Sequence, residues 1–466
     1  MSDNLTATIE ELQNFLAENP EVKTLEIIAP DMAGVLRGKR IPRVEFETFF
    51  SKGVQAPGSI PLLNTLGALS EAIGIGHHDG DPDKIMHPVK NSVALVPWLK
   101  SETAQVLATW FDLEGEPHMW DCRQILNQVV QRFRSDDLFP TIACELEFYL
   151  VEASENPARP QVKLSRVPGT TQPQPGVQYA MPEELWDNDD FLEAVREACE
   201  LQNIPATTVH TEFAPGQYEI NLHHVNDPLL ACDHAVLLKR VIKGVARQFG
   251  MTACFMAKPF VDSAGNGLHM HISVYDGQNR NIFLSDADDA GNPPISEVFR
   301  YAIGGLADTM SECMAIFAPN ANSYRRIQPG NYVPLTPNWG HNHRCVALRI
   351  PACDDKNLRI EHRVAGADAN PYLVLAAVLA GMHYGMAEKC APHGEMIRAG
   401  ELFEDETVTV PYRWDQSLDC FKLGKVLPQY FGEEYCRLYE RIRRSECDQF
   451  YAEVSDVDYA WYLRAV

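Results

Sequence analysis

The sequence of 466 residues contains no run of eighteen or more apolar residues and no pair of cysteines spaced as Cys-x-x-Cys. A helix that spans a bilayer needs about 20 apolar residues, so no membrane span or membrane partner is expected. The cysteine spacing excludes the usual structural zinc sites. The first twenty residues have neither a basic start nor an apolar core, so they do not predict a signal peptide, and a cytoplasmic location is expected.

Positive charge is scarce. The chain carries 40 Lys and Arg against 64 Asp and Glu, which gives a formal net charge of −24. Proteins that bind nucleic acid neutralise phosphates with a basic surface, so nucleic acid is not an expected partner. The acidic field favours cationic ligands and metal ions instead. Four cysteines in apolar surroundings are predicted to be buried free thiols, which suits a reducing compartment: Cys144, Cys232, Cys254 and Cys313.

The length predicts two or more domains. A turn-rich cluster at residues 113–117 is the expected boundary, which divides the chain into residues 1–116 and residues 117–466. Asp121 then has the position of a helix N-cap, and the apolar spacing predicts a helix from Cys122 to Phe133.

The segment from Lys258 to Ser273 is the most informative in the chain. Its end alternates polar and apolar residues, so a strand would place His269, His271 and Ser273 on one face. The opposite face would be wholly apolar and would pack into a core. The polar face is equipped for a metal and a phosphate-bearing ligand, although a strand with a solvated polar face is the alternative interpretation.

Four further segments repeat this arrangement. Each alternates apolar residues with acids, histidine or arginine, and the polar members are Glu145 and Glu147; His210, Glu212 and Glu219; Arg344 and Arg349; and Arg359, Glu361 and Arg363. Carboxylates with one imidazole suit Mg²⁺ or Mn²⁺, and arginines suit phosphate and carboxylate groups. Together they favour phosphoryl transfer assisted by two metal ions, if the segments do not belong to separate surfaces.

The same segments resemble the glutamine synthetase superfamily along essentially the whole chain. The stretch 258–273 matches its ATP-binding signature, and ELEFYL, PGQYE, NSYRRIQPG, RCVALRIP, RIEHR and GADANPYL resemble its other blocks in the same order. Within the superfamily the chain is similar to the gamma-glutamylputrescine synthetases. The resemblance implies an α+β fold, with a small N-terminal β-grasp-like domain and a large catalytic domain built on a curved antiparallel sheet lined by helices.

The resemblance also implies roles for individual residues. One Mg²⁺ or Mn²⁺ ion would be held by Glu147, Glu212 and Glu219, and the other by Glu145, His269 and Glu361. ATP, as substrate, would lie along His271, Ser273, Arg349, Lys356 and Arg359. Glutamate would be held by Gly265, Arg326, Arg344 and Arg363. Arg344, Arg326 and Tyr332 would be the catalytic residues, with Arg344 stabilising the phosphate in transfer.

Three departures from the family pattern concern the substrates. Ammonia-using members carry a glutamate where this chain has Tyr332, and an aspartate in the loop that here contains Ala56. Ala264 replaces an asparagine that contacts glutamate in those members. Both anionic partners of ammonium are thus missing, so the amine is expected to be larger, and Tyr332 and Glu71 are candidate amine-binding residues.

The resemblance, with these departures, implies an ATP-dependent carbon–nitrogen ligase that joins the γ-carboxyl of L-glutamate to a primary amine, most simply putrescine or another polyamine, through γ-glutamyl phosphate. Classical glutamine synthesis from ammonium is the alternative, and a non-catalytic member of the superfamily is a third possibility. The resemblance implies a homo-oligomer, a dodecamer of two hexameric rings, with active sites at the subunit interfaces.

Overall fold

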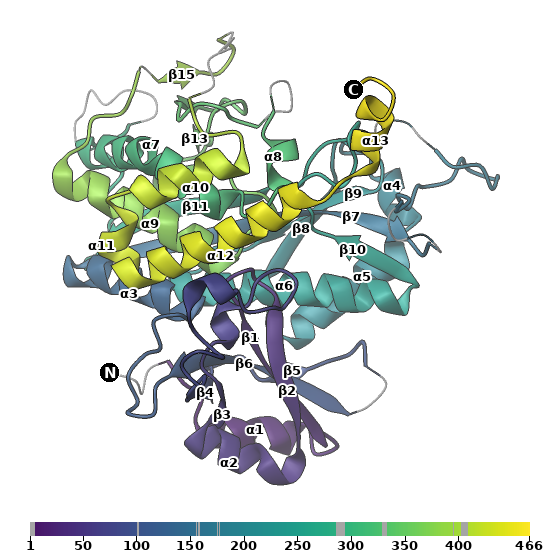
Figure 1. Cartoon of the computed structure of the whole chain (residues 1–466), viewed down its shortest axis with the longest axis vertical. Coiled ribbons are helices and arrows are strands. Elements are labelled where there is room, and N and C mark those ends of the chain that lie inside the picture. The colour runs from purple at the N-terminus through teal and green to yellow at the C-terminus, as the bar shows by residue number, and fades with distance from the viewer. Residues whose placement is uncertain are drawn as a thin grey trace.

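The computed structural model describes residues 5–99, 102–154, 156, 159–174, 176, 178–285, 294–328, 333–394, 396–401 and 409–466. Two sheets organise the chain, a smaller one near the N-terminus and a larger one after it (Figure 1). Mixed helices and strands confirm the predicted α+β class. Among the described residues, no helix combines the length and the apolar character needed to cross a membrane.

The N-terminal unit, residues 5–111, holds a six-stranded sheet in the order β2-β1-β6-β4-β3, with β5 paired to β6. Strands β1 and β6 run parallel and the other pairs are antiparallel. Two helices complete the unit, and its core includes Leu25, Ile27, Phe46 and Trp110. The elements are α1 (Ile9–Glu18), β1 (Thr24–Pro30), β2 (Leu36–Pro42), α2 (Phe46–Lys52), β3 (Val54–Pro57), β4 (Asp83–Pro88), β5 (Ala94–Leu95) and β6 (Thr103–Phe111).

The larger sheet has nine strands in the order β15-β12-β13-β14-β11-β7-β9-β8, with β10 paired to β7. Its pairs are antiparallel, as predicted, except that β12 runs parallel to both β13 and β15. The strands are β7 (Leu138–Glu152), β8 (Ala206–Thr211), β9 (Gln217–Leu222), β10 (Met251–Cys254), β11 (Leu268–Asp276), β12 (Trp339–His341), β13 (Leu348–Ile350), β14 (Ile360–His362) and β15 (Ile397–Arg398).

Helices cover the apolar side of this sheet. Helices α3 and α6 pack against β7, and α9 packs against α3, α6 and α7. Asp121 caps α3 through the backbone N–H of Arg123, as the sequence predicts, and the helix continues two residues beyond Phe133. The helices are α3 (Cys122–Ser135), α4 (Glu183–Trp186), α5 (Asp189–Leu201), α6 (Pro228–Gln248), α7 (Glu297–Phe317), α8 (Ser323–Arg326), α9 (Pro371–Glu388), α10 (Trp414–Leu423), α11 (Leu427–Phe431), α12 (Glu433–Ala452) and α13 (Asp456–Tyr462).

The join between the two sheets matches the turn-rich segment at residues 113–117, between β6 and α3. Packing crosses that join, because Ile28 and Leu107 of the N-terminal unit belong to the same apolar cluster as the helices of the larger unit. The division at residue 116 therefore stays a prediction. Of the four cysteines expected inside, Cys144, Cys232 and Cys313 are buried and Cys254 is half-buried.

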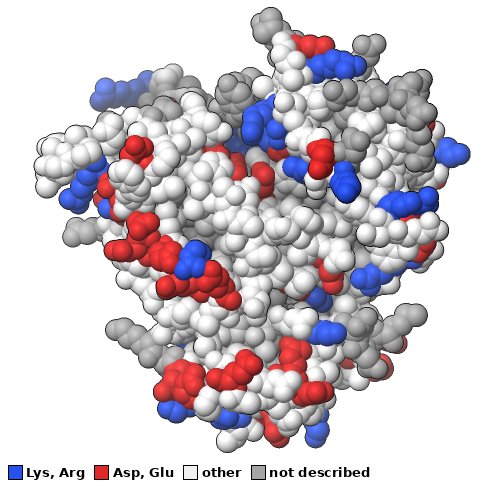
Figure 2. All heavy atoms as spheres, turned by 180° about the vertical axis from the view of Figure 1, so that it is seen from behind, with Lys and Arg blue, Asp and Glu red and all other residues white. Residues whose placement is uncertain are grey.

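Acidic side chains gather on the surface over particular elements. The long red patch at the left of Figure 2 lies over α5, whose exposed residues include Asp189, Asp190, Glu193, Glu197 and Glu200. Arg196, on the same helix, forms ion pairs with Glu193 and Glu200. This patch accounts for part of the net charge of −24 and offers no surface to nucleic acid.

Candidate active site

Apart from Arg344, which is exposed outside the strands, the polar residues predicted from five separate segments lie on or next to one face of one sheet, because the strand registers align them. Glu147 of β7 stands opposite Glu219 of β9, and Glu145 stands opposite His269 of β11. On the far side of β11, His271 pairs with Glu361 of β14. The alternative of separate surfaces is thereby excluded.

Three groups of these side chains bring ligand atoms within 4.8 Å of one another. The first, Glu145, His269 and Glu361, is the set implied for one metal ion. The other two groups are Glu147, Glu219 and His269, and His210, Glu212 and Glu219. Glu219 belongs to both of these groups. It therefore links Glu147 to Glu212, and these three residues are the set implied for the second metal ion.

His210 is a residue that the sequence analysis did not assign to the metal site. It lies on β8 opposite Glu219, and its Nε2 is 3.0 Å from Glu212 and 3.8 Å from Glu219. The sequence could have predicted this position. His210 is two residues before Glu212, and residues two apart in a strand lie on the same face.

Burial and like charge act strongly on the carboxylates of β9 and β7. Burial, with the nearby charges of Glu145, Glu147 and Glu212, raises the pKa of Glu219 to about 9. Burial also raises the pKa of Glu147, and the charge of Glu212 adds to that effect. Carboxylates that repel one another in a buried site are stabilised by a bound cation, so the donor set fits a divalent metal.

Other acids of the site already have cationic partners. Burial alone would raise the pKa of Glu145, but hydrogen bonds with His269 and His271 hold it well below its usual range. The pKa of Glu361 is lowered to about 2: burial opposes this, and the charges of Arg363, His271, His269 and Arg349 outweigh it. Glu361 forms ion pairs with Arg349 and with Arg363. The site therefore juxtaposes carboxylates whose pKa is raised with carboxylates whose pKa is lowered.

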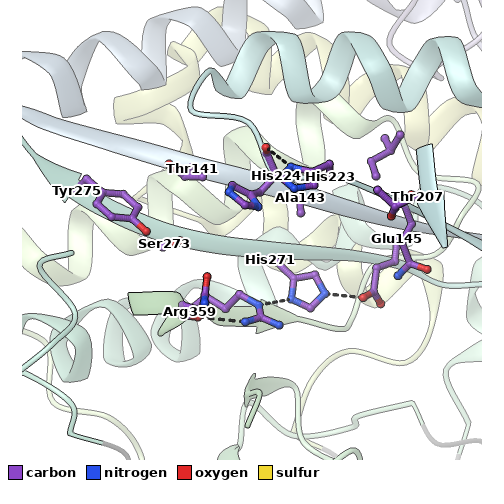
Figure 3. A pocket seen from close by; sticks show the side chains of 13 residues that line it. Thr141, Ala143, Glu145, Thr207, His223, His224, His271, Ser273, Tyr275 and Arg359 are labelled. Carbon is purple, nitrogen blue, oxygen red and sulfur yellow. Dashed lines mark hydrogen bonds and ion pairs between the residues drawn. The ribbon is translucent and has the colours of Figure 1, made fainter. Parts of the chain in front are cut away.

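A pocket of about 330 Å³ opens beside the acids, along β11 and the ends of β9 and β14. Figure 3 shows Arg359, His271 and Glu145 joined in a line of hydrogen bonds: Arg359 Nε donates to His271 Nδ1 over 3.2 Å, and His271 Nε2 is 2.7 Å from Glu145. Ser273 lies farther along the same strand face, so three of the residues implied for ATP line one pocket.

The pocket also contains residues that the sequence analysis did not select. The rings of His223 and His224 stack with centroids 4.3 Å apart, beyond the end of β9. Tyr275 is two residues past Ser273 on β11, and Thr141 stands opposite Ser273 on β7. The alternation of side chains along these strands could have predicted that Tyr275 and Thr141 lie on the pocket side. The two histidines lie in an irregular segment after β9, where no repeating pattern predicts which way a side chain points.

Two residues implied for glutamate lie beside the acids. A Cβ atom at Gly265 would come within 2.8 Å of the Arg326 side chain, so the chain there passes close to this buried arginine. Arg326 Nη1 donates to the carbonyl of Val364 over 2.8 Å. The backbone N–H of Gly267 donates to Glu147 over 2.7 Å, which places the Gly265–Gly267 loop at the edge of the acids.

Three implied residues are not brought into the cluster by the described contacts of one chain. Arg344 is exposed, and Lys356 is exposed in the 3-10 turn Asp355–Asn357. Glu71 lies in a 3-10 turn, Glu71–Ile73, that packs against α12. Tyr332 lies outside the described residues, so its predicted role is untested.

The sequence that builds this site matches a known enzyme family. Residues 119–462 match the model of the glutamine synthetase catalytic domain. The chain belongs to the glutamine synthetase family. It is therefore a ligase of that family, and the resemblance of its motifs is confirmed.

Individual members of the family resemble the chain along nearly its whole length. Gamma-glutamylputrescine synthetase PuuA of Escherichia coli K12 is 37% identical over 459 residues, which cover 98% of this chain and 95% of that protein. Glutamate–isopropylamine ligase of a Pseudomonas species is 28% identical, with 99% of each chain covered. The solved structure of apo GmaS superposes with a TM-score of 0.82 at 24% identity, covering 97% of this chain and 99% of that one, and confirms the fold.

Proposed function

We propose that this protein joins the γ-carboxyl of L-glutamate to a primary amine, putrescine or another polyamine, at the expense of ATP. The observation that carries the proposal is the aligned row of carboxylates beside a pocket lined by His271, Ser273 and Arg359. A carboxylate is a poor electrophile, because its leaving group would be oxide. Phosphorylation gives γ-glutamyl phosphate, which an amine can attack with release of phosphate.

The proposed residue roles are those that the family resemblance implies. Glu145, His269 and Glu361 would hold one Mg²⁺ or Mn²⁺ ion, and Glu147, Glu212 and Glu219 would hold the second. When bound, the ions supply positive charge that neutralises the phosphate oxygens. Because His210 contacts Glu212, it would keep that carboxylate turned toward the site.

Basic side chains would bind the anionic groups of the substrates. Arg349 and Arg359, together with Arg344, would bear on the transferring phosphoryl group, where positioning and charge neutralisation are the main sources of rate. Arg326 and Arg363 would orient glutamate by its carboxylates. Lys356 would lie near the nucleotide.

The amine preference is supported by two replacements in the sequence and by the similarity to a putrescine-using enzyme. At the amine site, ammonium would lack the acids that Ala56 and Tyr332 replace. Leaving a cation unpaired in a partly dry site is costly. A diamine can present a neutral amine to the acyl phosphate and leave its second ammonium nearer to water. Glutamine synthesis from ammonium is the competing function, favoured by more distant relatives that are glutamine synthetases, such as the type-1 enzyme of Dictyostelium discoideum at 29% identity.

The substrate is tested by phosphate release that depends on both ATP and glutamate, measured with ammonium, ethanolamine, putrescine, cadaverine, spermidine and spermine. We expect kcat/KM for a diamine or polyamine to exceed that for ammonium by at least about 100-fold, the cost of leaving one charge unpaired. Tyr332→Glu should narrow the ratio. Equal use of ammonium by the unmodified protein would replace this proposal with ordinary glutamine synthesis.

We also propose assembly into a dodecamer of two hexameric rings in the cytoplasm. The C-terminal helix α13 supports self-association, because Trp461 is 67% and Leu463 is 72% exposed in the single chain. The buried thiols Cys144 and Cys232 suit a reducing compartment. Sedimentation at assay concentration tests the assembly: an active monomer would contradict sites shared between neighbouring subunits.

A further inference from the structure

A second cavity, of about 1140 Å³, lies between the N-terminal unit and the larger unit. Its lining residues come from β2 and the residues before it, from α6, and from β10 with the segment that follows. Figure 1 shows where these elements lie in the fold. None of the residues proposed for metal, ATP or glutamate lines it. The cavity is therefore separate from the proposed active site.

The charge of the cavity lining is opposite in sign to the net charge of the protein. Its lining includes six cationic residues and two acidic ones, in a chain whose net charge is −24. The cations are Arg40, Lys239, Arg240, Lys243, Arg247 and Arg443, and the acids are Glu26 and Asp368. Glu26 pairs with Arg40 and Arg240. Asp368 accepts hydrogen bonds from Asn320 and Ser323 at Oδ2, and its buried Oδ1 has no hydrogen-bond partner among the described residues.

Helix α6 supplies the densest part of this charge. Lys239, Lys243 and Arg247 are spaced four residues apart, so they follow one another along the same face, about 6 Å apart along the axis. The side chains of Lys243 and Arg247 make no hydrogen bond or ion pair with any residue that the structure describes. Two adjacent cations on this wall are thus left without an anionic partner.

The two lysines are held close together. The Nζ atoms of Lys239 and Lys243 each lie 5.5 Å from the centroid of the Phe255 ring. Lys239 Nζ donates to the carbonyl of Ala367 over 2.5 Å. Burial, with the charge of Lys243, lowers the pKa of Lys239 to about 7. Keeping both ammonium groups charged side by side is unfavourable until an anion joins them.

On α6, Lys243 and Arg247 are exposed at the mouth of the cavity, and Lys239 lies half-buried behind them. The face of α6 that carries these residues looks into the space enclosed by β2 and Trp98 of the N-terminal unit. Arg240 lies over the Trp98 ring, and the indole packs so closely on the helix that a Cβ at Gly244 would come within 2.5 Å of it. Arg40 faces the row from the opposite unit, so a ligand could contact both units at once.

We propose that this cavity binds a small anion carrying two or more phosphoryl groups, either free or as part of a nucleotide. Lys243 and Arg247 hold the anion from α6, with Lys239 beside them, and Arg40 contacts it from β2. Bound there, the anion joins the N-terminal unit to the larger unit. It stabilises the protein without entering the proposed active site.

The test uses the full-length protein in EDTA, because phosphates in the proposed catalytic pocket need metal ions to neutralise its carboxylates. Inorganic pyrophosphate and ADP are titrated separately at constant ionic strength, and binding is followed by calorimetry and by the melting temperature. Lys243→Ala/Arg247→Ala should weaken binding of at least one probe by tenfold or more and should remove its effect on melting. The probe that binds more tightly identifies free phosphate or nucleotide as the source.

Two control variants make the outcome specific. Lys52→Ala/Arg134→Ala removes the same charge from exposed positions elsewhere and should bind like the unmodified protein. Lys243→Arg/Arg247→Lys keeps the charge and should retain binding within a few-fold. The proposal is overturned if Lys243→Ala/Arg247→Ala binds both probes as tightly as the unmodified protein does. It is also overturned if sulfate, at matched ionic strength, stabilises the unmodified protein as much as the two probes do.

Discussion

The two faces of strand β11 differ in chemistry and hardly at all in burial. Leu268, Met270, Ile272 and Val274 are each 0% exposed, whereas His269, His271 and Ser273 on the other face are 7%, 8% and 9% exposed. A polar strand face usually meets solvent, and this one is almost as enclosed as the core. Alternation therefore separates a face that stabilises the fold from a face that is free for chemistry.

The difference between the faces has an energetic cost. On the apolar face, each fully buried aliphatic side chain contributes about 1.5–3 kcal/mol of transfer free energy. On the polar face, Glu219 is held among three other carboxylates, and its pKa of about 9 measures how unfavourable its ionised form is. Substitutions on the two faces should consequently separate activity from stability.

The largest effect is expected from Glu147→Ala on the polar face. It removes one anionic ligand from the proposed site of a divalent ion, so phosphate release should fall by at least about 1000-fold, the loss expected when charge stabilisation of a transferring phosphoryl group fails. The melting temperature in EDTA should be retained, because Glu147 ionises at a cost in the folded protein.

Glu152→Ala on the same strand is the matched control for Glu147→Ala. Glu152 ends β7 and is exposed, so this variant should keep both its activity and its melting temperature. Turnover of Glu147→Ala at the level of Glu152→Ala would remove Glu147 from the metal site. Full activity of the unmodified protein in EDTA would contradict the whole metal assignment.

Removing metal ions should make stability depend on pH in a diagnostic direction. The folded protein raises the pKa of Glu219 from 4.5 to about 9, so between these values the folded state binds the proton more tightly than the unfolded state. Stability in EDTA is then fully present below pH 4.5 and is lost as pH rises toward 9, by at most about 4 kcal/mol between pH 5 and 8.

Saturating Mg²⁺ or Mn²⁺ should flatten that dependence, because a bound cation offsets the repulsion among the carboxylates. The measurement is denaturant unfolding from pH 5 to 8 with and without metal. The lowered pKa values of Glu145 and Glu361 act below pH 4.5 and leave this window undisturbed. Buried His362, whose pKa is lowered to about 3, adds stability as pH rises toward 6.5, so Glu219→Gln is the reference. A pH dependence that is the same in the metal-free Glu219→Gln and unmodified proteins would refute the raised pKa of Glu219.

On the apolar face, Ile272→Ala should lower the free energy of unfolding by about 3 kcal/mol, since it removes buried methyl groups and leaves a cavity. The KM for ATP and the kcat of the folded fraction should stay within about twofold of the original, because the side chain points away from the pocket. Denaturant unfolding and steady-state assays measure the two effects. A loss of kcat without a loss of stability would show that the faces are not independent.

The sequence predicts β11 and its polar face well because a period of two is a local property. The alignment of Glu147 with Glu219, and of Glu145 with His269, depends on registers between segments about 70 to 125 residues apart, and no local pattern encodes those registers. His224 was missed for a similar reason, since an irregular segment carries it into the pocket. The parallel pairing of β12 is also a tertiary choice, made by strands of only three residues.

The smallest effect tests two adjacent residues of β11 against each other. Ser273 lines the ATP pocket and Val274 faces the core. Ser273→Ala removes one neutral hydrogen-bonding group, worth about 1 kcal/mol, so the KM for ATP should rise about fivefold while the free energy of unfolding is unchanged. Val274→Ala should do the reverse, with about 2 kcal/mol less stability and an unchanged KM. If both variants changed the KM for ATP, or both changed the free energy of unfolding, adjacent residues of β11 would not have the separate roles that alternation predicts.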